Sequence, residues 1–199
     1  MAVSLQKGQK VDLRKDNGGE LTGVMVGLGW DEAKSGGVLG LFGKKQDIDC
    51  DASAIALQDG RLVSKRNDVV YYANLSHPSG CIKHMGDNLT GAGEGDDEQI
   101  FVDLKNLPAE YDRIVFVVNI FQAASRHQHF GLIENAFIRI CDDKGVELCR
   151  YNLSESYDNM TAMIFGELYR HNGAWKFNAI GQATTDNSID DLARRFMKK

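Results

Sequence analysis

Short runs in which apolar and polar residues alternate recur along most of the chain, and this pattern restricts its fold most strongly. Side chains of a β-strand point to opposite faces in turn, so a period of two is typical of strands. The runs follow one another closely, and the chain contains only two Pro residues. Many short, closely spaced strands favour an all-β sandwich. The runs are Val11–Leu13, Val24–Leu28, Ile48–Leu57, Val69–Tyr72, Gln99–Leu104, Ile114–Phe121, Asn135–Cys141, Glu147–Leu153, Ala162–Arg170 and Ala174–Ile180.

Turn signals between neighbouring runs predict antiparallel pairing. Asn172-Gly173 separates the last two runs, and Asn-Gly is a strong signal for a tight hairpin. The segment 142–145 separates another adjacent pair of runs and ends in Gly145. No linker or internal repeat divides the 199 residues. We therefore expect one domain over residues 1–199, a β-sandwich of two mostly antiparallel sheets with short peripheral helices.

Helix signals are few. Ser188 stands three residues before Asp191, which resembles a capping box with Asp in place of Glu. The apolar residues that follow recur on one helical face, which predicts a C-terminal helix at about 188–198 lying on the body of the domain. A second helical turn is expected in Ala123–Phe130, stopped by Gly131. The Gly-rich segment Ser35–Lys45 is expected to form a mobile loop.

The stretch GDNLTGAGEGDDE, Gly86–Glu98, holds five acids and no Lys, Arg or His. The formal net charge of the whole chain, −5, equals the charge of this stretch. One interpretation is a solvated acidic loop, which most charge runs are. The other is a site for a hard cation such as Ca²⁺, because carboxylates, Asn side chains and backbone carbonyls are its ligands and Gly lets a loop fold back around it. The acids are Asp87, Glu94, Asp96, Asp97 and Glu98.

A second acidic group lies at the start of a strand run, where Asp47, Asp49 and Asp51 alternate with apolar residues. The three acids would line one face while Ile48, Cys50 and Ala52 enter the core. Neighbouring like charges repel, and a divalent cation would relieve that repulsion. The alternative is an exposed strand face that serves solubility. An EF-hand is excluded, because its Gly and Glu positions are taken by Ala52 and Gln58.

Two further acids are candidates for the same kind of site. Asp31 follows directly after an apolar strand run, where a site carried by a loop would form. Glu167 is a lone acid in an apolar strand and must face water or a partner. A simple turn at Asp31 and an outward-facing strand position at Glu167 are the alternatives.

Other classes of function have little support. The excess of acids argues against nucleic acid as the main partner. The N-terminus has no apolar signal region and no run could span a bilayer, so we expect a cytoplasmic protein without a transmembrane segment. The four Cys residues form no CxxC motif, and we expect buried free thiols. His127 and His129 form an isolated HxH pair, which is a weak signal for a transition metal. No recognisable catalytic Ser or Cys motif is present.

Seven strings, spread from residue 3 to about residue 182, together resemble the TerD family, the tellurite-resistance and general stress proteins of bacteria. They are Val3-Ser4-Leu5-x-Lys7-Gly8, Val26-Gly27-Leu28-Gly29-Trp30-Asp31, Asp49-x-Asp51-Ala52-Ser53, Gly86-Asp87-Asn88-Leu89-Thr90-Gly91, Gly95-Asp96-Asp97-Glu98-Gln99, Asn135-Ala136-Phe137-x-Arg139 and Phe165-Gly166-Glu167-Leu168-Tyr169-Arg170-His171. The resemblance departs at Ala92, where many members carry an acid, and in the C-terminal residues 184–199.

The resemblance implies a β-sandwich with its core at about 3–182 that binds two Ca²⁺ ions at sites built from the acidic strings. It implies a role in resistance to tellurite, oxidative or other chemical stress, as a Ca²⁺-dependent binding or sensor module and not an enzyme. The expected ligands are Asp31, Asp49 and Asp51 with Glu167 or the loop acids, and Asp87, Asn88, Asp96, Asp97 and Glu98 with the carbonyls of Gly91 and Gly93.

Two other functions stay open at this point. Clustered carboxylates can hold two metals that activate water, as in a metal-dependent hydrolase or phosphoesterase. Ca²⁺ could also bridge the acidic face to anionic lipid or to a protein partner of a stress-response complex, which would make the protein a scaffold at the membrane surface. Direct tellurite chemistry by the four thiols is a weaker idea.

Overall fold

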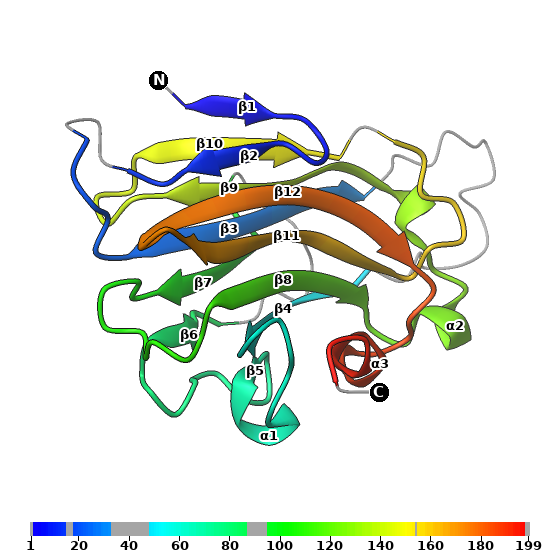
Figure 1. Ribbon diagram of the computed structural model, residues 1–199. Coiled ribbons are helices and arrows are strands. Elements are labelled where there is room, and N and C mark those ends of the chain that lie inside the picture. The colour runs from blue at the N-terminus through cyan, green and yellow to red at the C-terminus, as the bar shows by residue number, and fades with distance from the viewer. Residues whose placement is uncertain (1, 15–17, 33–47, 87–94, 154, 198–199) are drawn as a thin grey trace.

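The computed structural model describes residues 2–14, 18–32, 48–86, 95–153 and 155–197, which form two six-stranded β-sheets packed face to face (Figure 1). The strands are β1 (Val3–Leu5), β2 (Lys10–Asp12), β3 (Val24–Glu32), β4 (Cys50–Leu57), β5 (Val69–Val70), β6 (Ile82–His84), β7 (Glu98–Val102), β8 (Arg113–Ile120), β9 (Ile133–Cys141), β10 (Glu147–Asn152), β11 (Ala162–His171) and β12 (Ala174–Thr184).

The two sheets draw strands from the whole length of the chain. Sheet A has the order β1-β10-β9-β3-β7-β6, and sheet B has the order β2-β12-β11-β8-β4-β5. Every pair of neighbouring strands is antiparallel except β1 and β10, which run parallel. The prediction of a sandwich of two mostly antiparallel sheets is therefore confirmed. The outermost strands, β1, β2, β5 and β6, have only two or three residues each.

The main apolar core lies between the sheets, and a second one lies on the outer face of sheet B. Ile138, Ile140 and Val26 of sheet A are fully buried in the main core, together with Phe116 and Phe177 of sheet B. The second core packs helix α3 (Ile189–Arg194) against side chains of β4, β8 and β11. Strands β4 and β8 are consequently buried on both faces, which explains why their sequences are nearly continuous apolar runs.

The hairpin between β11 and β12 follows its sequence signal. Asn172 and Gly173 both have positive φ angles, of 51° and 77°, as a tight hairpin of the I′ type requires. β12 runs four residues beyond the expected end at Ile180, because a register shift near Gly181, with φ of +60°, lets the strand continue to Thr184.

The helices are short and lie at the periphery. The C-terminal helix is present, and the Ser188 hydroxyl accepts from the Asp191 N–H at 3.2 Å, but α3 ends at Arg194. Helix α2 (Ala123–Arg126) ends at His127, whose φ is +52°. The prediction that Gly131 stops this helix is wrong, because Gly131 lies inside a separate 3-10 turn. The remaining helix is α1 (Lys65–Asp68), and the 3-10 turn is Phe130–Leu132.

Two expectations can be compared with the structure only in part. The Gly-rich segment Ser35–Lys45 lies outside the described residues. No helix among the described residues is long and apolar enough to cross a membrane.

Candidate functional site

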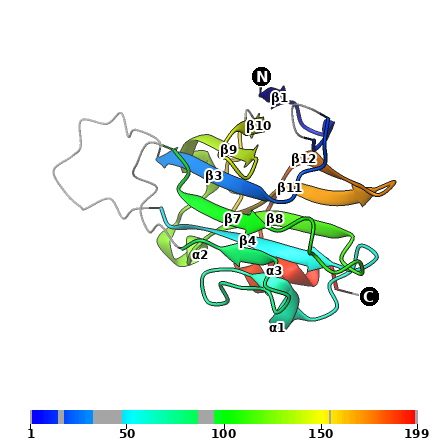
Figure 2. The same cartoon turned by 90° about the vertical axis from the view of Figure 1, so that its left-hand side faces the viewer.

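Four acids in β4 and β7, or directly before these strands, lie near enough to the thiol of Cys50 for their charges to act on it. Burial raises the pKa of Cys50 far above its usual value, and the charges of Glu98, Asp51, Asp49 and Asp97 raise it further. Figure 2 places the end of β3 and the start of β4 on the same side of the molecule. Acids from three of the acidic strings therefore lie toward the same end of the sandwich.

A pocket of about 550 Å³ opens beside this end, with walls from sheet A. Asp31 at the end of β3 and Asp97 just before β7 both line it, as does Gly95. The remaining lining residues are Trp30, Asn135, Phe137, Arg150, Asn152 and Leu153. The pocket thus combines two carboxylates, two amide side chains and one guanidinium.

Two hydrogen bonds join Asp97 to the main chain of β3, one from its own N–H and one to its carboxylate. The Asp97 N–H donates to the carbonyl of Leu28 at 2.8 Å, and the Trp30 N–H donates to Asp97 Oδ2, also at 2.8 Å. Burial raises the pKa of the Asp97 carboxyl, the Trp30 hydrogen bond lowers it, and the charges of Asp31 and Asp96 raise it. The balance is a raised pKa, so the ionised form of Asp97 is disfavoured in the pocket.

A bulge in β9 aims a side chain at Asp31. The pairing of β3 with β9 shifts register between Gly29 and Asp31, and Asn135 on β9 has a φ of +53°. Its side-chain Nδ2 donates to Asp31 Oδ2 at 2.8 Å. Bulges commonly redirect side chains in this way, and Asn is among the few residues that adopt this backbone region readily. The bulge therefore fixes one oxygen of Asp31 and leaves the other for a ligand.

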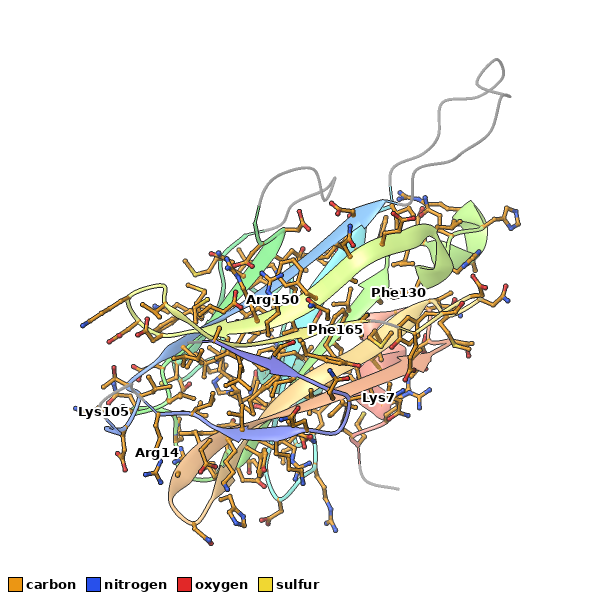
Figure 3. All side chains as sticks on the ribbon, turned by 90° about the horizontal axis from the view of Figure 1, so that it is seen from above. Lys7, Arg14, Lys105, Phe130, Arg150 and Phe165 are labelled. Atoms are coloured by element: carbon orange, nitrogen blue, oxygen red, sulfur yellow. The ribbon has the colours of Figure 1, made fainter. Side chains whose placement is uncertain are left out.

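Glycine at position 29 makes room for two parts of the pocket wall. A Cβ there would lie 2.5 Å from the Phe137 ring and 2.9 Å from the carbonyl oxygen of Gly95. Arg150 on β10, labelled in Figure 3, stacks its guanidinium on Phe137, 3.9 Å from the ring centroid. Its Nε lies 3.4 Å from both carboxylate oxygens of Glu147.

Asp96, although adjacent to Asp97, is held in an ion pair. Arg139 Nε donates to Asp96 Oδ1 at 2.6 Å and Arg139 Nη2 donates to Oδ2 at 3.0 Å. Gln99 Nε2 donates to the same Oδ2 at 2.9 Å. The carboxylate lies over Gly27, where a Cβ would overlap it. Both oxygens of Asp96 are therefore engaged with protein donors.

Glu98 is buried between the sheets, where it bonds to the main chain of β4. Its Oε2 accepts from the Ala52 N–H at 2.5 Å, and His84 Nε2 lies 3.2 Å from the carbonyl of Ala52. β5 pairs with β4 only at Ala54 and Ile55, so Ala52 has no strand neighbour on that side among the described residues. Side chains from β6 and β7 take the place of that neighbour, which gives Glu98 a clear structural role.

Asp49, directly before β4, and Asp51 on it are less exposed than acids of an outward strand face would be. Asp51 is only 6% exposed, and Asn119 Nδ2 donates to its Oδ2 at 3.4 Å. Asp49 is half-buried, while Ile48, Cys50 and Ala52 enter the main core as expected. The interpretation of this face as an exposed, solubilising one is therefore wrong at Asp51.

Glu167 lies apart from the other candidate acids. On β8, its neighbour Val115 is four residues from Asn119, the neighbour of Asp51, which is about 13 Å along the strand. Arg113 Nη1 donates to Glu167 Oε2 at 2.7 Å and Asn178 Nδ2 donates to Oε1 at 2.9 Å. The structure does not bring Glu167 to the pocket, and its partners are protein groups.

Part of the predicted ligand set cannot be placed. Asp47, Asp87, Asn88, Gly91 and Gly93 lie outside the described residues, so their roles stay predictions. Within the described ranges, no group of three or more His, Cys, Asp or Glu side chains could hold a metal ion by itself. A cation in the pocket would need main-chain or amide oxygens beside Asp31 and Asp97.

Of the nine lining residues, only Asp31 and Asp97 were predicted site residues, and the seven others include Asn135, Phe137, Arg150 and Asn152. Asn135 and Phe137 belong to a string that carries the family resemblance, but the string alone assigns them no role. Arg150 and Asn152 lie on one face of a strand, at every second position, which is also the pattern of an ordinary exposed strand face.

Comparisons with known proteins agree on one family. The family model described as the TerD domain matches residues 1–196. The stress response protein SCP2 of Bacillus subtilis is 46% identical over 99% of this chain and 100% of its own length. The tellurium resistance protein TerD of Serratia marcescens is 46% identical over 92% of this chain and 91% of its own. A crystal structure of a TerD homologue from Streptomyces coelicolor superimposes with a TM-score of 0.62 at 23% identity, over 85% of this chain and 94% of that one.

Proposed function

This chain belongs to the TerD domain family, and we propose that it is a stress-response protein that binds Ca²⁺ in the pocket lined by Asp31 and Asp97. Its relatives are named for tellurium resistance and for general stress response, and those names indicate no enzymatic activity. We therefore assign it a Ca²⁺-dependent binding role in resistance to tellurite or other chemical stress.

One observation carries the proposal: two carboxylates and the Gly95 main chain line the same pocket. Ca²⁺ takes six to eight oxygen ligands, mixing carboxylates with main-chain and amide carbonyls. Asp31 has one oxygen fixed by Asn135, and Gly29 leaves space for the carbonyl oxygen of Gly95. The donor set therefore consists of the hard oxygens that Ca²⁺ prefers.

The electrostatics of the pocket support the same assignment. Asp97 is partly buried, and the charge of Asp31 acts against its ionisation. A bound divalent cation would reverse that unfavourable interaction, because each carboxylate would then face an opposite charge. The side chains of Asp96 and Glu167 are held by Arg139 and Arg113, so we leave both out of the proposed ligands.

Isothermal titration calorimetry on chelator-stripped protein tests the proposal, with Mg²⁺ as the control ion. We expect saturable Ca²⁺ binding that is weakened in Asp31→Asn and in Asp97→Asn. The family resemblance implies two ions, with Asp49 and Asp51 as candidates for the second. Glu110→Gln is the matched control, since it removes one exposed acid that does not line the pocket. No binding up to millimolar Ca²⁺, or equal binding by Asp97→Asn, would overturn the proposal.

The cellular role has its own test. Growth of a bacterial strain that lacks its own copy should recover on tellurite medium when it expresses this protein, and the Asp97→Asn variant should fail to restore growth at equal protein level. Recovery by both would separate stress resistance from the pocket. Recovery by neither would place this member's role elsewhere in the stress response.

A further inference from the structure

The pocket proposed for Ca²⁺ also contains a positively charged side chain, which a site for the cation alone would not need. Arg150 lines the same pocket as Asp31 and Asp97. A guanidinium repels Ca²⁺, so its presence weakens cation binding unless a further ligand joins the two. The feature to explain is why an Arg stands in a calcium pocket.

Arg150 is held in place with its outer edge free. Its guanidinium stacks on Phe137, 3.9 Å from the ring centroid, and its Nε lies 3.4 Å from each oxygen of Glu147. No described group accepts from Nη1 or Nη2, and the side chain is 32% exposed. A planar fork that is fixed by stacking, and whose two Nη groups bind no described residue, suits the paired oxygens of an anion.

The sign of the pocket's charge depends on the cation. Asp31, Asp97 and Arg150 together give the lining a net charge of −1, so an anion is disfavoured while the cation is absent. One Ca²⁺ would bring the same lining to +1. The few protein oxygens in the pocket would also leave coordination positions on the ion for oxygens of a ligand. Anion binding in this pocket would therefore require Ca²⁺.

We propose that the Ca²⁺-loaded pocket binds a phosphate group, which bridges the ion and the Nη1 and Nη2 atoms of Arg150. This inference rests on the proposed Ca²⁺ site and adds the class of its ligand. A phosphate has oxygens in tetrahedral array, so it can direct some to the ion and others to the guanidinium. A planar carboxylate has only two oxygens to share between them. The phosphate can come from a soluble monoester or from a lipid whose headgroup is a phosphomonoester, such as phosphatidic acid, and both present the same three terminal oxygens.

The protein gives a matched set of variants for the test. Arg150→Gln removes the charge and the fork, and Arg150→Lys keeps the charge without the fork. Arg66→Gln is the control, because Arg66 is exposed on α1 and does not line this pocket. Each variant is first titrated with Ca²⁺ alone. We expect Arg150→Gln to bind it at least as tightly as the parent protein, since Arg150 repels the ion, and the other two variants to bind it about as tightly as the parent.

The second titration uses glycerol 3-phosphate, added with saturating Ca²⁺ and, separately, with chelator. We expect binding only with Ca²⁺, weakened about 10- to 100-fold in Arg150→Gln, less in Arg150→Lys and not in Arg66→Gln. Co-sedimentation with vesicles of phosphatidic acid and phosphatidylcholine distinguishes the sources. Ca²⁺-dependent sedimentation that Arg150→Gln abolishes identifies a headgroup, and binding of the monoester without sedimentation identifies a soluble ligand.

Three results would overturn the inference. They are phosphate binding that does not need Ca²⁺, binding that is equal in Arg150→Gln, and absence of binding to both probes in protein that binds Ca²⁺. In each case the first titration still shows Ca²⁺ binding, so the proposed function survives. If the first titration shows no Ca²⁺ binding, the proposed function and this inference fail together.

Discussion

Arg139 binds Asp96 through two parallel hydrogen bonds, from Nε to Oδ1 at 2.6 Å and from Nη2 to Oδ2 at 3.0 Å. The Asp96 side chain is only 2% exposed, so its carboxylate has lost its hydration, and the ion pair with Arg139 compensates for that loss. The pair joins β9 to the segment before β7 across β3. It separates Asp96, with a structural role, from its neighbour Asp97 in the pocket.

We expect Arg139→Met to lower the free energy of unfolding by about 3 kcal/mol, because it leaves a buried carboxylate without its counter-charge. The double variant Asp96→Asn/Arg139→Met should lose less than the single one. Urea unfolding followed by tryptophan fluorescence measures both. Calcium affinity should change little in Asp96→Asn. If Asp96→Asn instead abolished Ca²⁺ binding, Asp96 would be a ligand, and its purely structural role would be wrong.

Asp97→Asn is expected to move stability in opposite directions with and without Ca²⁺. Without the ion, the variant should be more stable than the parent at neutral pH, because it removes a charge that burial and Asp31 disfavour. With Ca²⁺ at a hundred times Kd, the parent should gain about 2.7 kcal/mol by linkage, or roughly 5–10 °C in Tm, and the variant should gain little. Calorimetric melting of both proteins, in chelator and in Ca²⁺, checks whether the order of their stabilities reverses. Parallel shifts in both proteins would contradict it.

The stability of the Ca²⁺-free protein should depend on pH in a way that also reflects the unfavourable charge of Asp97. The pKa of Asp97 is raised above its usual 3.8, so the folded state holds this proton more tightly than the unfolded chain. The stability that protonation contributes is fully present below about pH 3.8 and is lost as the pH rises through the raised folded value. The advantage of Asp97→Asn in urea unfolding should therefore grow between about pH 4 and pH 7. A constant difference would mean that Asp97 is not perturbed.

The four thiols should be unreactive in the native protein. All four Cys are buried and free. Burial raises the pKa of Cys149 to about 12 and also raises that of Cys50 well above its usual value, so the reactive thiolate is scarce near neutral pH. We expect a disulfide reagent such as DTNB to release almost no colour at pH 8 until denaturant is added. Rapid release from the folded protein would reopen direct tellurite chemistry by these residues.

Two glycines of β3 offer a matched pair of substitutions. Gly27→Ala places a Cβ against the Asp96 carboxylate, and Gly29→Ala places one against Phe137 and the Gly95 carbonyl oxygen. Each should cost about 1–3 kcal/mol in the free energy of unfolding, because the neighbours must shift. Only Gly29→Ala should also weaken Ca²⁺ binding in the titration. Equal affinity in both variants would place the ion away from Gly29.

Much of the sandwich could be predicted because local sequence patterns identify most of its strands. Asn172-Gly173 specifies its own turn, and the apolar run of β8 reflects burial on both faces. Strands of three residues give a weak periodic signal: a run was identified at β2, but none at β1 or β6. β1 also pairs in parallel with β10, which is more than 140 residues away, and no local pattern encodes such a partner.

The candidate site was harder to predict than the fold. The sequence marks Asp96, Asp97 and Glu98 as three equal acids. Their roles differ because Arg139, Trp30 and Ala52, each from a different strand, donate to them. The bulge that turns Asn135 toward Asp31 is likewise a product of strand pairing. Which N–H group binds each carboxylate is set by the tertiary structure, so the positions of the acids in the sequence do not predict it.

The outermost strands restrict how this protein can assemble with others. β1 and β2 are consecutive in the chain and end the two sheets on one side, and β5 and β6 do so on the other. Both edges of each sheet are therefore formed by very short strands. Each edge strand has only two or three residues with which a strand of another molecule could pair. Sheet extension by a partner, or by another copy, has almost no template here. Recognition is left to the broad faces and to the ends of the sandwich, where the acidic pocket opens.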